Sequence, residues 1–134
     1  MVVDLPARVD LMALSALDLA DRICVVTEAV VTTVVATQRL LTMLDELGFG
    51  DRIRVVLNRQ AALEGNLTEA AIGQRLSRPV DRVIPYDRSV VVAANRGAPL
   101  VLSQRRGAFT DAVGELAGDF VESTARTAAT MLRR

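Results

Sequence analysis

The sequence contains no histidine, lysine or tryptophan, and its 134 residues include a single cysteine. The absence of histidine excludes Ser/His/Asp and Cys/His catalysis and most zinc sites. The absence of lysine excludes a phosphate-loop lysine, a Schiff base and a lysine general base within these residues. The 16 basic residues are therefore all arginines. This composition disfavours chemistry carried out by the side chains of this chain alone.

Charge and hydropathy are also unremarkable. The 16 basic residues balance 16 acidic ones, so the net charge is zero and no overall field draws the chain onto nucleic acid or anionic lipid. Asp4 and Arg8 interrupt the start before an apolar signal region could form. The uncharged stretch at residues 29–38 is shorter than the roughly 20 residues of a membrane-spanning helix. We therefore expect a cytoplasmic protein.

The lone cysteine, Cys24, lies inside the apolar run ICVVT. This position predicts a small core residue in a reducing compartment, and not a nucleophile or a disulfide partner.

Four short runs rich in β-branched residues predict central strands of a parallel sheet. They are VVDL from Val2, RICVVT from Arg22, RIRVVLN from Arg52 and DRVIPY from Asp81. Between them the apolar residues recur at helical spacing, as in the segment at residues 31–47, which Gly48 is placed to end. This alternation predicts one α/β domain over residues 1–134, a parallel sheet with flanking helices.

Two further helices are expected. Asn66 is placed to cap a short helix together with Glu69, three residues later. A last helix begins near Gly107 and buries an apolar stripe that includes Phe109, Leu116 and Phe120.

Polar residues follow the predicted strands, at the edge of an open parallel sheet where ligands bind. They are Asp4, Thr27, Glu28, Asn58, Arg59, Pro85, Tyr86 and Asp87. Asp4 can hold Mg²⁺ beside a companion phosphate loop, or it can cap the following helix. The amide of Asn58 can match the edge of a purine, or the residue can simply form a turn. Arg59 can contact phosphate or remain solvated.

The order and spacing of four segments resemble the MinD/ParA-type deviant Walker ATPases, with the pilus-assembly branch called CpaE or TadZ the most similar. VVDLPARVD is similar to the Walker B strand and switch II of that family, and VVLNR to its nucleotide-side strand. LADRICVVTEAVVTTVVATQRLL resembles the family's next strand and helix. The most specific piece is RPVDRVIPYDRSVVVAANRGAPLV, with its Ile-Pro turn and its Asn-x-Gly-x-Pro ending.

The resemblance implies a P-loop NTPase-like fold with ATP and Mg²⁺ as cofactors, and it carries roles to matching positions. Asp4 would be the Walker B acid near Mg²⁺, and Asn58 would lie against the adenine beside Arg59. The remainder of the base pocket would come from the backbone of Ile84, Pro85, Tyr86 and Asp87. The DLPAR segment would respond to the γ-phosphate and help to form a dimer interface. No residue of the chain is implied to be catalytic.

The family's phosphate loop, with two lysines, lies on a strand before the VVDLP segment, and no such loop is found in these residues. The resemblance therefore implies the C-terminal half of such an ATPase, without the N-terminal phosphate-loop strand. We expect weak ATP binding, no hydrolysis by this chain alone, and either a homodimer or completion by another chain.

Two functions are open from the sequence. The first is the ATP-binding part of an ATPase that positions a pilus or secretion assembly, a septum site or a chromosome, with protein components of that apparatus as partners. The second is a non-catalytic interaction or dimerisation module that uses an apolar helix face at Val30, Val31, Val34 and Val35. The scattered arginines and the net charge of zero disfavour nucleic acid as a partner. The C-terminal ARTAATMLRR segment predicts weak and peripheral membrane association at most.

Overall fold

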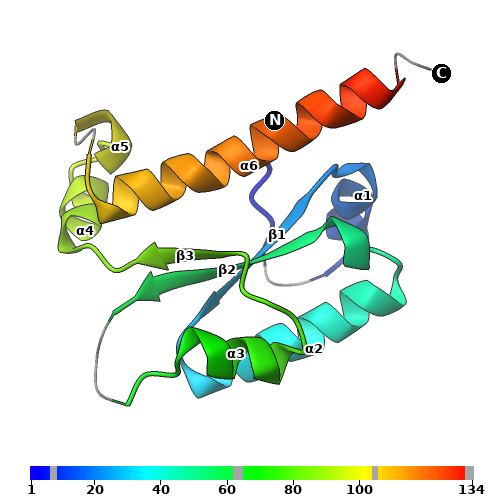
Figure 1. Cartoon of the computed structure of the whole chain (residues 1–134), viewed down its shortest axis with the longest axis horizontal. Coiled ribbons are helices and arrows are strands. Elements are labelled where there is room, and N and C mark those ends of the chain that lie inside the picture. The colour runs from blue at the N-terminus through cyan, green and yellow to red at the C-terminus, as the bar shows by residue number, and fades with distance from the viewer. Residues whose placement is uncertain (7–8, 62–64, 104–105, 132–134) are drawn as a thin grey trace.

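The computed structural model of the chain describes residues 1–6, 9–61, 65–103 and 106–131, those after residue 121 as backbone only. Within these residues, three parallel strands form one sheet in the order β1-β2-β3 (Figure 1). They are β1 (Ile23–Glu28), β2 (Ile53–Gln60) and β3 (Arg82–Pro85). The expected α/β fold, a parallel sheet with flanking helices, is confirmed.

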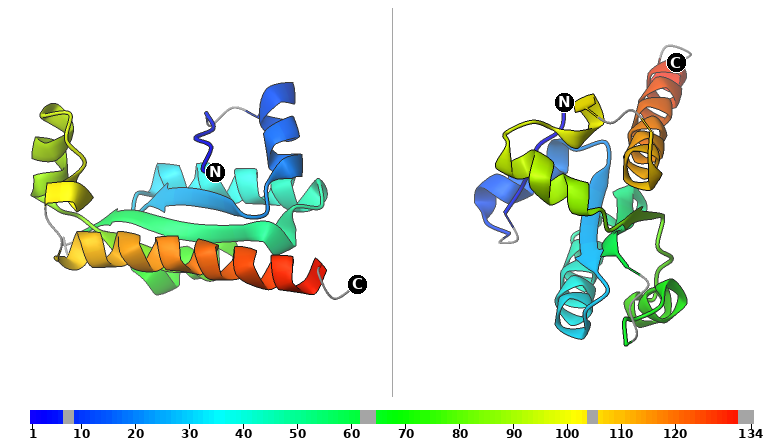
Figure 2. Two further views of the ribbon diagram at one scale, coloured as in Figure 1. Left: turned by 90° about the horizontal axis from the view of Figure 1, so that it is seen from above. Right: turned by 90° about the vertical axis from the view of Figure 1, so that its left-hand side faces the viewer.

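The helices lie on both faces of this sheet. α2 and α3 pack against one face, whereas α6 runs along the opposite face beside β3 (Figures 1 and 2). α4 and α5 contact each other beyond the carboxyl end of β3 (Figure 2). The bounds are α1 (Leu11–Leu19), α2 (Val31–Glu46), a 3₁₀ turn η1 (Gly50–Arg52), α3 (Glu69–Leu76), α4 (Arg88–Asn95), α5 (Leu100–Ser103) and α6 (Ala108–Met131).

The main core lies between the sheet and the two helices beneath it. Alternate residues of β1 and β2 point into it, because side chains in a strand alternate between the faces. Core residues from the two strands and from α2 and α3 are Ile23, Val25, Ile53, Val55, Leu57, Val34, Leu41, Leu44, Ile72 and Leu76. A buried hydrogen bond, in which the Thr37 hydroxyl donates to that of Thr27 at 3.0 Å, ties α2 to β1.

The end of α2 was predicted correctly. Gly48 has φ of 83°, in the left-handed region that glycine enters without a Cβ clash, and its amide donates to the carbonyl of Asp45. Gly97, with φ of 64°, follows the end of α4 in the same way.

The predicted strand at residues 2–5 is wrong. Residues 1–6 have no regular secondary structure and lie beyond the edge of β1 without pairing to it (Figure 2). Val2 is 98% exposed, and only Leu5 packs against the core. A strand needs a hydrogen-bonded neighbour, and among the described residues none pairs with this segment.

The structure also corrects three smaller predictions, which concern the cap of α3, the burial of Cys24 and the burial of α6. The cap of α3 is Thr68, whose hydroxyl accepts from the amide of Ala71 at 3.2 Å, and not Asn66. Cys24 is exposed instead of buried, because it points to the face of β1 that α2 does not cover. The apolar stripe of α6 is half buried.

The sequence reasoning missed α1. Asp10 caps this helix by accepting from the amide of Ala13 at 3.0 Å. Only Ala13 and Leu17 are buried in α1, while Leu11 and Met12 are exposed. Among the described residues, no helix has both the length and the apolar character needed to cross a bilayer. Parts of the predicted switch segment (Ala7, Arg8) and of the basic C-terminus (residues 132–134) lie outside the described residues.

Candidate functional site

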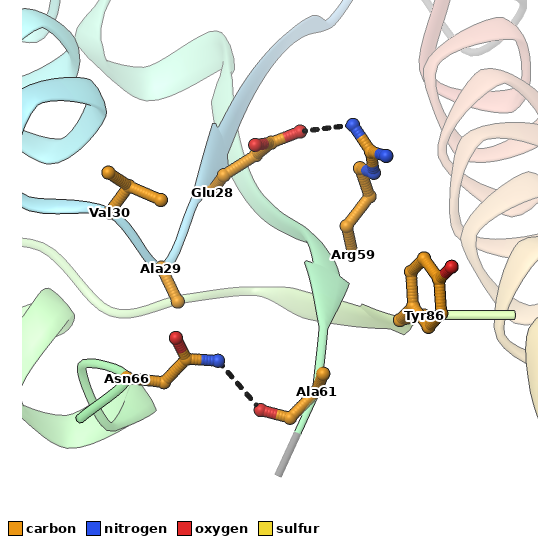
Figure 3. A pocket seen from close by; sticks show the side chains of 7 residues that line it. All are labelled: Glu28, Ala29, Val30, Arg59, Ala61, Asn66 and Tyr86. Atoms are coloured by element: carbon orange, nitrogen blue, oxygen red, sulfur yellow. Dashed lines mark hydrogen bonds and ion pairs between the residues drawn. The ribbon is translucent and has the colours of Figure 1, made fainter. Parts of the chain in front are cut away.

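A pocket of about 290 Å³ opens where the three strands end (Figure 3). Because the strands are parallel, their carboxyl ends meet at this edge, which is the usual ligand position in open α/β sheets. We call it the strand-end pocket, and its lining residues are Glu28, Ala29, Val30, Arg59, Ala61, Asn66 and Tyr86. Each strand, or the segment directly after it, contributes to the lining.

One wall of the strand-end pocket carries an ion pair. The guanidinium of Arg59 lies 3.5 Å from a carboxylate oxygen of Glu28. Arg59 has φ of 55°, an uncommon backbone conformation for a residue with a side chain. Its amide donates to Oδ1 of Asn58 at 2.9 Å. Both charged side chains are more than one-third exposed, so the pair contributes little to stability, but it neutralises this wall of the pocket.

Tyr86, the only tyrosine in the chain, also lines the pocket. Its amide donates to the carbonyl of Gln60 at 2.8 Å, which continues the pairing of β3 with β2. The next residue, Asp87, caps α4 by accepting from the amide of Ser89 at 2.7 Å. Tyr86 is therefore held between a strand and a helix cap, while 49% of it remains exposed.

Asn66 enters the pocket from the loop before α3. Its Nδ2 donates to the carbonyl of Ala61 at 2.9 Å, as the dashed line in Figure 3 marks. This bond fixes the orientation of the amide, so that Oδ1 points away from Ala61 (Figure 3).

The predicted site residues divide into two groups. Arg59 and Tyr86 line the strand-end pocket. Asn58 does not line it, and its side-chain Oδ1 accepts a hydrogen bond from the amide of Arg59. Ile84 is a buried apolar residue, Pro85 pairs with Gln60 in the sheet, and Asp87 is a helix cap.

Asp4 is not at the end of a strand, because residues 1–6 form none, and it does not cap α1, whose cap is Asp10. The described part of the chain contains no group of three or more acidic, cysteine or histidine side chains placed to hold a metal ion. The Mg²⁺ role of Asp4 therefore stays a prediction.

Five lining residues were not predicted as binding residues: Glu28, Ala29, Val30, Ala61 and Asn66. Glu28 was recognised as a polar residue at a strand end but had no assigned role, and Ala29 and Asn66 were not considered as ligand contacts. The signal for Asn66 was ambiguous, because asparagine is favoured both in turns and at helix caps.

Comparison with known proteins decides the family relationship. Over 107 residues the chain is 31% identical to the septum site-determining protein MinD of Thermotoga maritima, an alignment that covers 76% of this chain and 40% of the relative. The chain is homologous to MinD/ParA-type ATPases. None of the known protein-family models matches the chain.

Solved structures show the same MinD-like fold. The MinC:MinD cell division complex of Aquifex aeolicus superposes with a TM-score of 0.72 at 21% identity, over 85% of this chain and 48% of that one. MinD of Pyrococcus horikoshii OT3, in complex with Mg-ADP, gives 0.67 at 24% identity, over 80% and 44%. A ParA family ATPase from Chlorobium tepidum TLS gives 0.70 at 22% identity, over 81% and 45%. The chain spans less than half the length of these MinD and ParA proteins.

Proposed function

We propose that this chain forms the adenine-binding side of a nucleotide site in a MinD/ParA-like ATPase. The observation that carries the proposal is the strand-end pocket, which all three strands of a MinD-like sheet help to line. The fit on the base side rests on polar groups and one aromatic ring around a cavity of modest size. When bound, Mg²⁺-ATP supplies the triphosphate chemistry, and the residues of this chain bind and orient the base.

The phosphate side of the site would come from outside these 134 residues. The sequence offers no lysine for the β- and γ-phosphates, and a second copy or another chain or segment would supply that group. Asp4 is proposed as the Walker B acid near Mg²⁺, since magnesium sites need only one or two carboxylates beside the phosphates. Asn58, Ile84, Pro85 and Asp87 would act by shaping the backbone around the base.

The cellular role we propose is positioning of an apparatus in the cytoplasm, such as a septum site, a Flp/Tad pilus or secretion assembly, or a chromosome. Support comes from the MinD name of the relative and from the resemblance to the CpaE/TadZ branch in the DRVIPY and NRGAPLV segments. Protein components of that apparatus are the proposed partners.

The test is calorimetric titration of the 134-residue chain with ATP and ADP in the presence of Mg²⁺, together with an assay of phosphate release. We expect weak binding and no measurable release, because the groups that stabilise the transferring phosphate are missing. Asp4→Ala should leave the base contribution to binding unchanged. Phosphate release that survives Asp4→Ala would contradict the proposed assignment.

The second hypothesis is a non-catalytic interaction module, and the exposed apolar helix face that it uses is smaller than the sequence predicted. Val30 and Val31 are 50% and 62% exposed, but Val34 is only 1% exposed and belongs to the core. This reading would be favoured if the chain bound no adenine nucleotide and a Val31→Asp variant lost binding to a protein component of the apparatus.

A further inference from the structure

α1 packs against the rest of the fold through a small surface. Ala13 and Leu17 are buried and Leu14 is half-buried, so the face toward the core carries few large side chains. The exposed apolar residues of the helix are Leu11, Met12 and Leu19, at 82%, 80% and 88%. α1 lies at the side of the sheet away from α6, beyond β1 (Figure 2). Little apolar surface therefore returns to water when α1 separates from the sheet, and segments of this kind open at a lower free energy than the core.

One side chain makes the hydrogen bonds that join α1 to the body of the fold. Nη1 of Arg52, in the turn η1 before β2, donates to the carbonyl of Asp18 at 3.0 Å and to that of Ala20 at 2.7 Å. Both carbonyls are at the C-terminal end of α1, where the helix itself provides no donor. The positive charge also faces the negative end of the helix dipole. In the part of the chain that the structure describes, no other hydrogen bond or ion pair links α1 to another element.

Arg52 is itself fixed to the core. Its amide donates to the carbonyl of Phe49 at 3.0 Å, and its guanidinium carbon lies 4.9 Å from the centre of the Phe49 ring. Phe49 is only 6% exposed and belongs to the main core. A cation over an aromatic face is attracted by the ring, so the guanidinium is held in place beside the end of α1. Arg52 thus connects α1 to the core through a single side chain.

We propose that Arg52 is the latch of a local opening, in which α1 separates from the sheet while the three strands and α2 stay folded. The two bonds from Nη1 hold the closed state, and both are broken in the open one. Among the described residues nothing comparable holds the other end of α1: residues 1–6 have no regular structure, and the bond between Asp10 and Ala13 lies within the helix and its cap. The strand-end pocket stays intact, since it lies at the opposite end of β1. The inference goes beyond the proposed function and does not depend on it, because no nucleotide takes part in the opening.

The experiment is amide hydrogen exchange of the 134-residue chain without ligand, followed by NMR and corrected for the intrinsic rate of each amide. We expect the amides of α1 to exchange faster than those of β2, because the local opening costs less than global unfolding. The free energy of the α1 opening should also fall less steeply with added urea, since a local opening exposes less surface. Equal rates and equal urea slopes in α1 and β2 would show that α1 opens only with the whole fold, which would overturn the inference.

Two variants separate the latch from the rest of the fold. Arg52→Ala should speed exchange in α1 about 10-fold, the loss expected for a pair of charge-assisted hydrogen bonds. It should speed exchange in β2 by the same factor, because the latch is absent from the unfolded state as well. Asp81→Ala breaks the hydrogen bond to the amide of Val55, which the open state keeps. This second variant should therefore speed exchange in β2 about 10-fold and leave α1 unchanged.

Arg22→Ala is the matched control. Arg22 also carries its charge just after the end of α1, but its Nη1 donates to the carbonyl of the adjacent Asp21, at 3.2 Å. This variant should leave the exchange of α1 unchanged, whereas an acceleration equal to that of Arg52→Ala would assign the effect to charge near the helix end. Arg52→Lys keeps the charge without the guanidinium fork and should speed exchange in α1 about 3-fold. It replaces Arg52→Ala if that variant does not fold.

Two further results would overturn the inference. Unchanged exchange of α1 in Arg52→Ala and Arg52→Lys would remove the latch. An acceleration of α1 in Asp81→Ala as large as that of β2 would mean that α1 and the sheet unfold together. Either result leaves the proposed function untouched, since the strand-end pocket takes no part in the opening.

Discussion

The two edge strands of the sheet, β1 and β3, have different surroundings. β3 is covered by α6, where Arg82 makes two hydrogen bonds to the carboxylate of Asp119 at 2.6 and 2.8 Å. On β1, the same face of the sheet is open: Cys24 is exposed and Val26 is 53% exposed. Among the described residues, no strand pairs with the outer edge of β1.

Amino-acid composition does not explain why one face of β1 is exposed, as a comparison with the central strand β2 shows. β1 reads ICVVTE and the central strand β2 reads IRVVLN over the paired residues. Val26 lies opposite Val56 in the register, yet Val56 is only 2% exposed. The same residue type at matched positions is therefore core in one strand and surface in the next. Its burial depends on the surroundings of the strand: β2 has a strand on either side, whereas β1 is an edge strand, and α6 packs against β3.

The largest expected effect comes from truncating these two valines. Val56→Ala should lower the free energy of unfolding by about 2 kcal/mol, because it removes two buried carbons at about 0.8 kcal/mol each and leaves a small cavity. Val26→Ala should change it by less than about 0.5 kcal/mol. Urea unfolding of both variants measures the difference.

The control for this pair is protein concentration. Equal losses in the two variants would contradict the comparison and would mean that the open face of β1 is covered in solution. If Val26→Ala becomes more destabilising as the concentration rises, the cover is a second molecule.

The next effect concerns how β3 joins β2. Asp81, just before β3, accepts from the buried amide of Val55 at 2.7 Å, and its own amide donates to the carbonyl of Val55 at 2.8 Å. Asp81→Ala should cost about 1.5 kcal/mol, because a buried donor loses its partner. Asp81→Asn keeps an acceptor oxygen and should cost clearly less. Equal destabilisation of the two variants by thermal unfolding would assign the effect to charge and not to the hydrogen bond.

These strands also show what the sequence could and could not predict. β1, β2, β3, the end of α2 and the start of α6 follow from local patterns, because apolar periodicity and glycine placement act over a few residues. The strand at residues 2–5 failed although VVDL has the same apolar character. A run of valines indicates a preference for burial. Strand formation also requires a neighbouring strand to pair with, and a local sequence pattern does not show whether one is present.

The candidate site followed the same rule. The position of the pocket was predictable, since parallel strands bring their carboxyl ends together, and so were Arg59 and Tyr86. Which of the polar side chains line the pocket could not be predicted. Asn58 and Asn66 are the same residue type near the same edge, yet only Asn66 lines the pocket. The deciding hydrogen bonds, to the amide of Arg59 and to the carbonyl of Ala61, depend on loop conformation.

A smaller effect is expected where α6 meets β3. Hydrogen bonding from Arg82, and then its positive charge, lowers the pKa of Asp119 below the ordinary aspartate value. Its contribution to stability is therefore fully present above the ordinary value and is lost as the pH falls through the lowered value of the folded state. Unfolding midpoints across acidic pH should show Asp119→Asn below the parent chain at neutral pH and equal to it in acid.

The screening of exposed charges gives the control for that experiment. Glu115 lies 3.5 Å from Arg82 and all three side chains are more than one-third exposed, so added salt should shrink the difference between the two proteins. A difference that stayed constant across pH and salt would assign the effect of the substitution to packing.

The smallest effect on stability belongs to Cys24, but this residue reports most directly on the open face of β1. Partial burial beside β2, and then the negative charge of Asp81, raises the pKa of the Cys24 thiol above its ordinary value. Because Cys24 is exposed, alkylation should go to completion in the folded protein. The rate should rise with pH, and its midpoint should lie above that of a free cysteine because the pKa of the thiol is raised. Asp81→Asn removes the charge and should move this midpoint downward, while Cys24→Ser should leave the unfolding midpoint unchanged. A thiol that reacted only after unfolding would contradict the exposure of this face, and it would place β1 and β3 in the same surroundings after all.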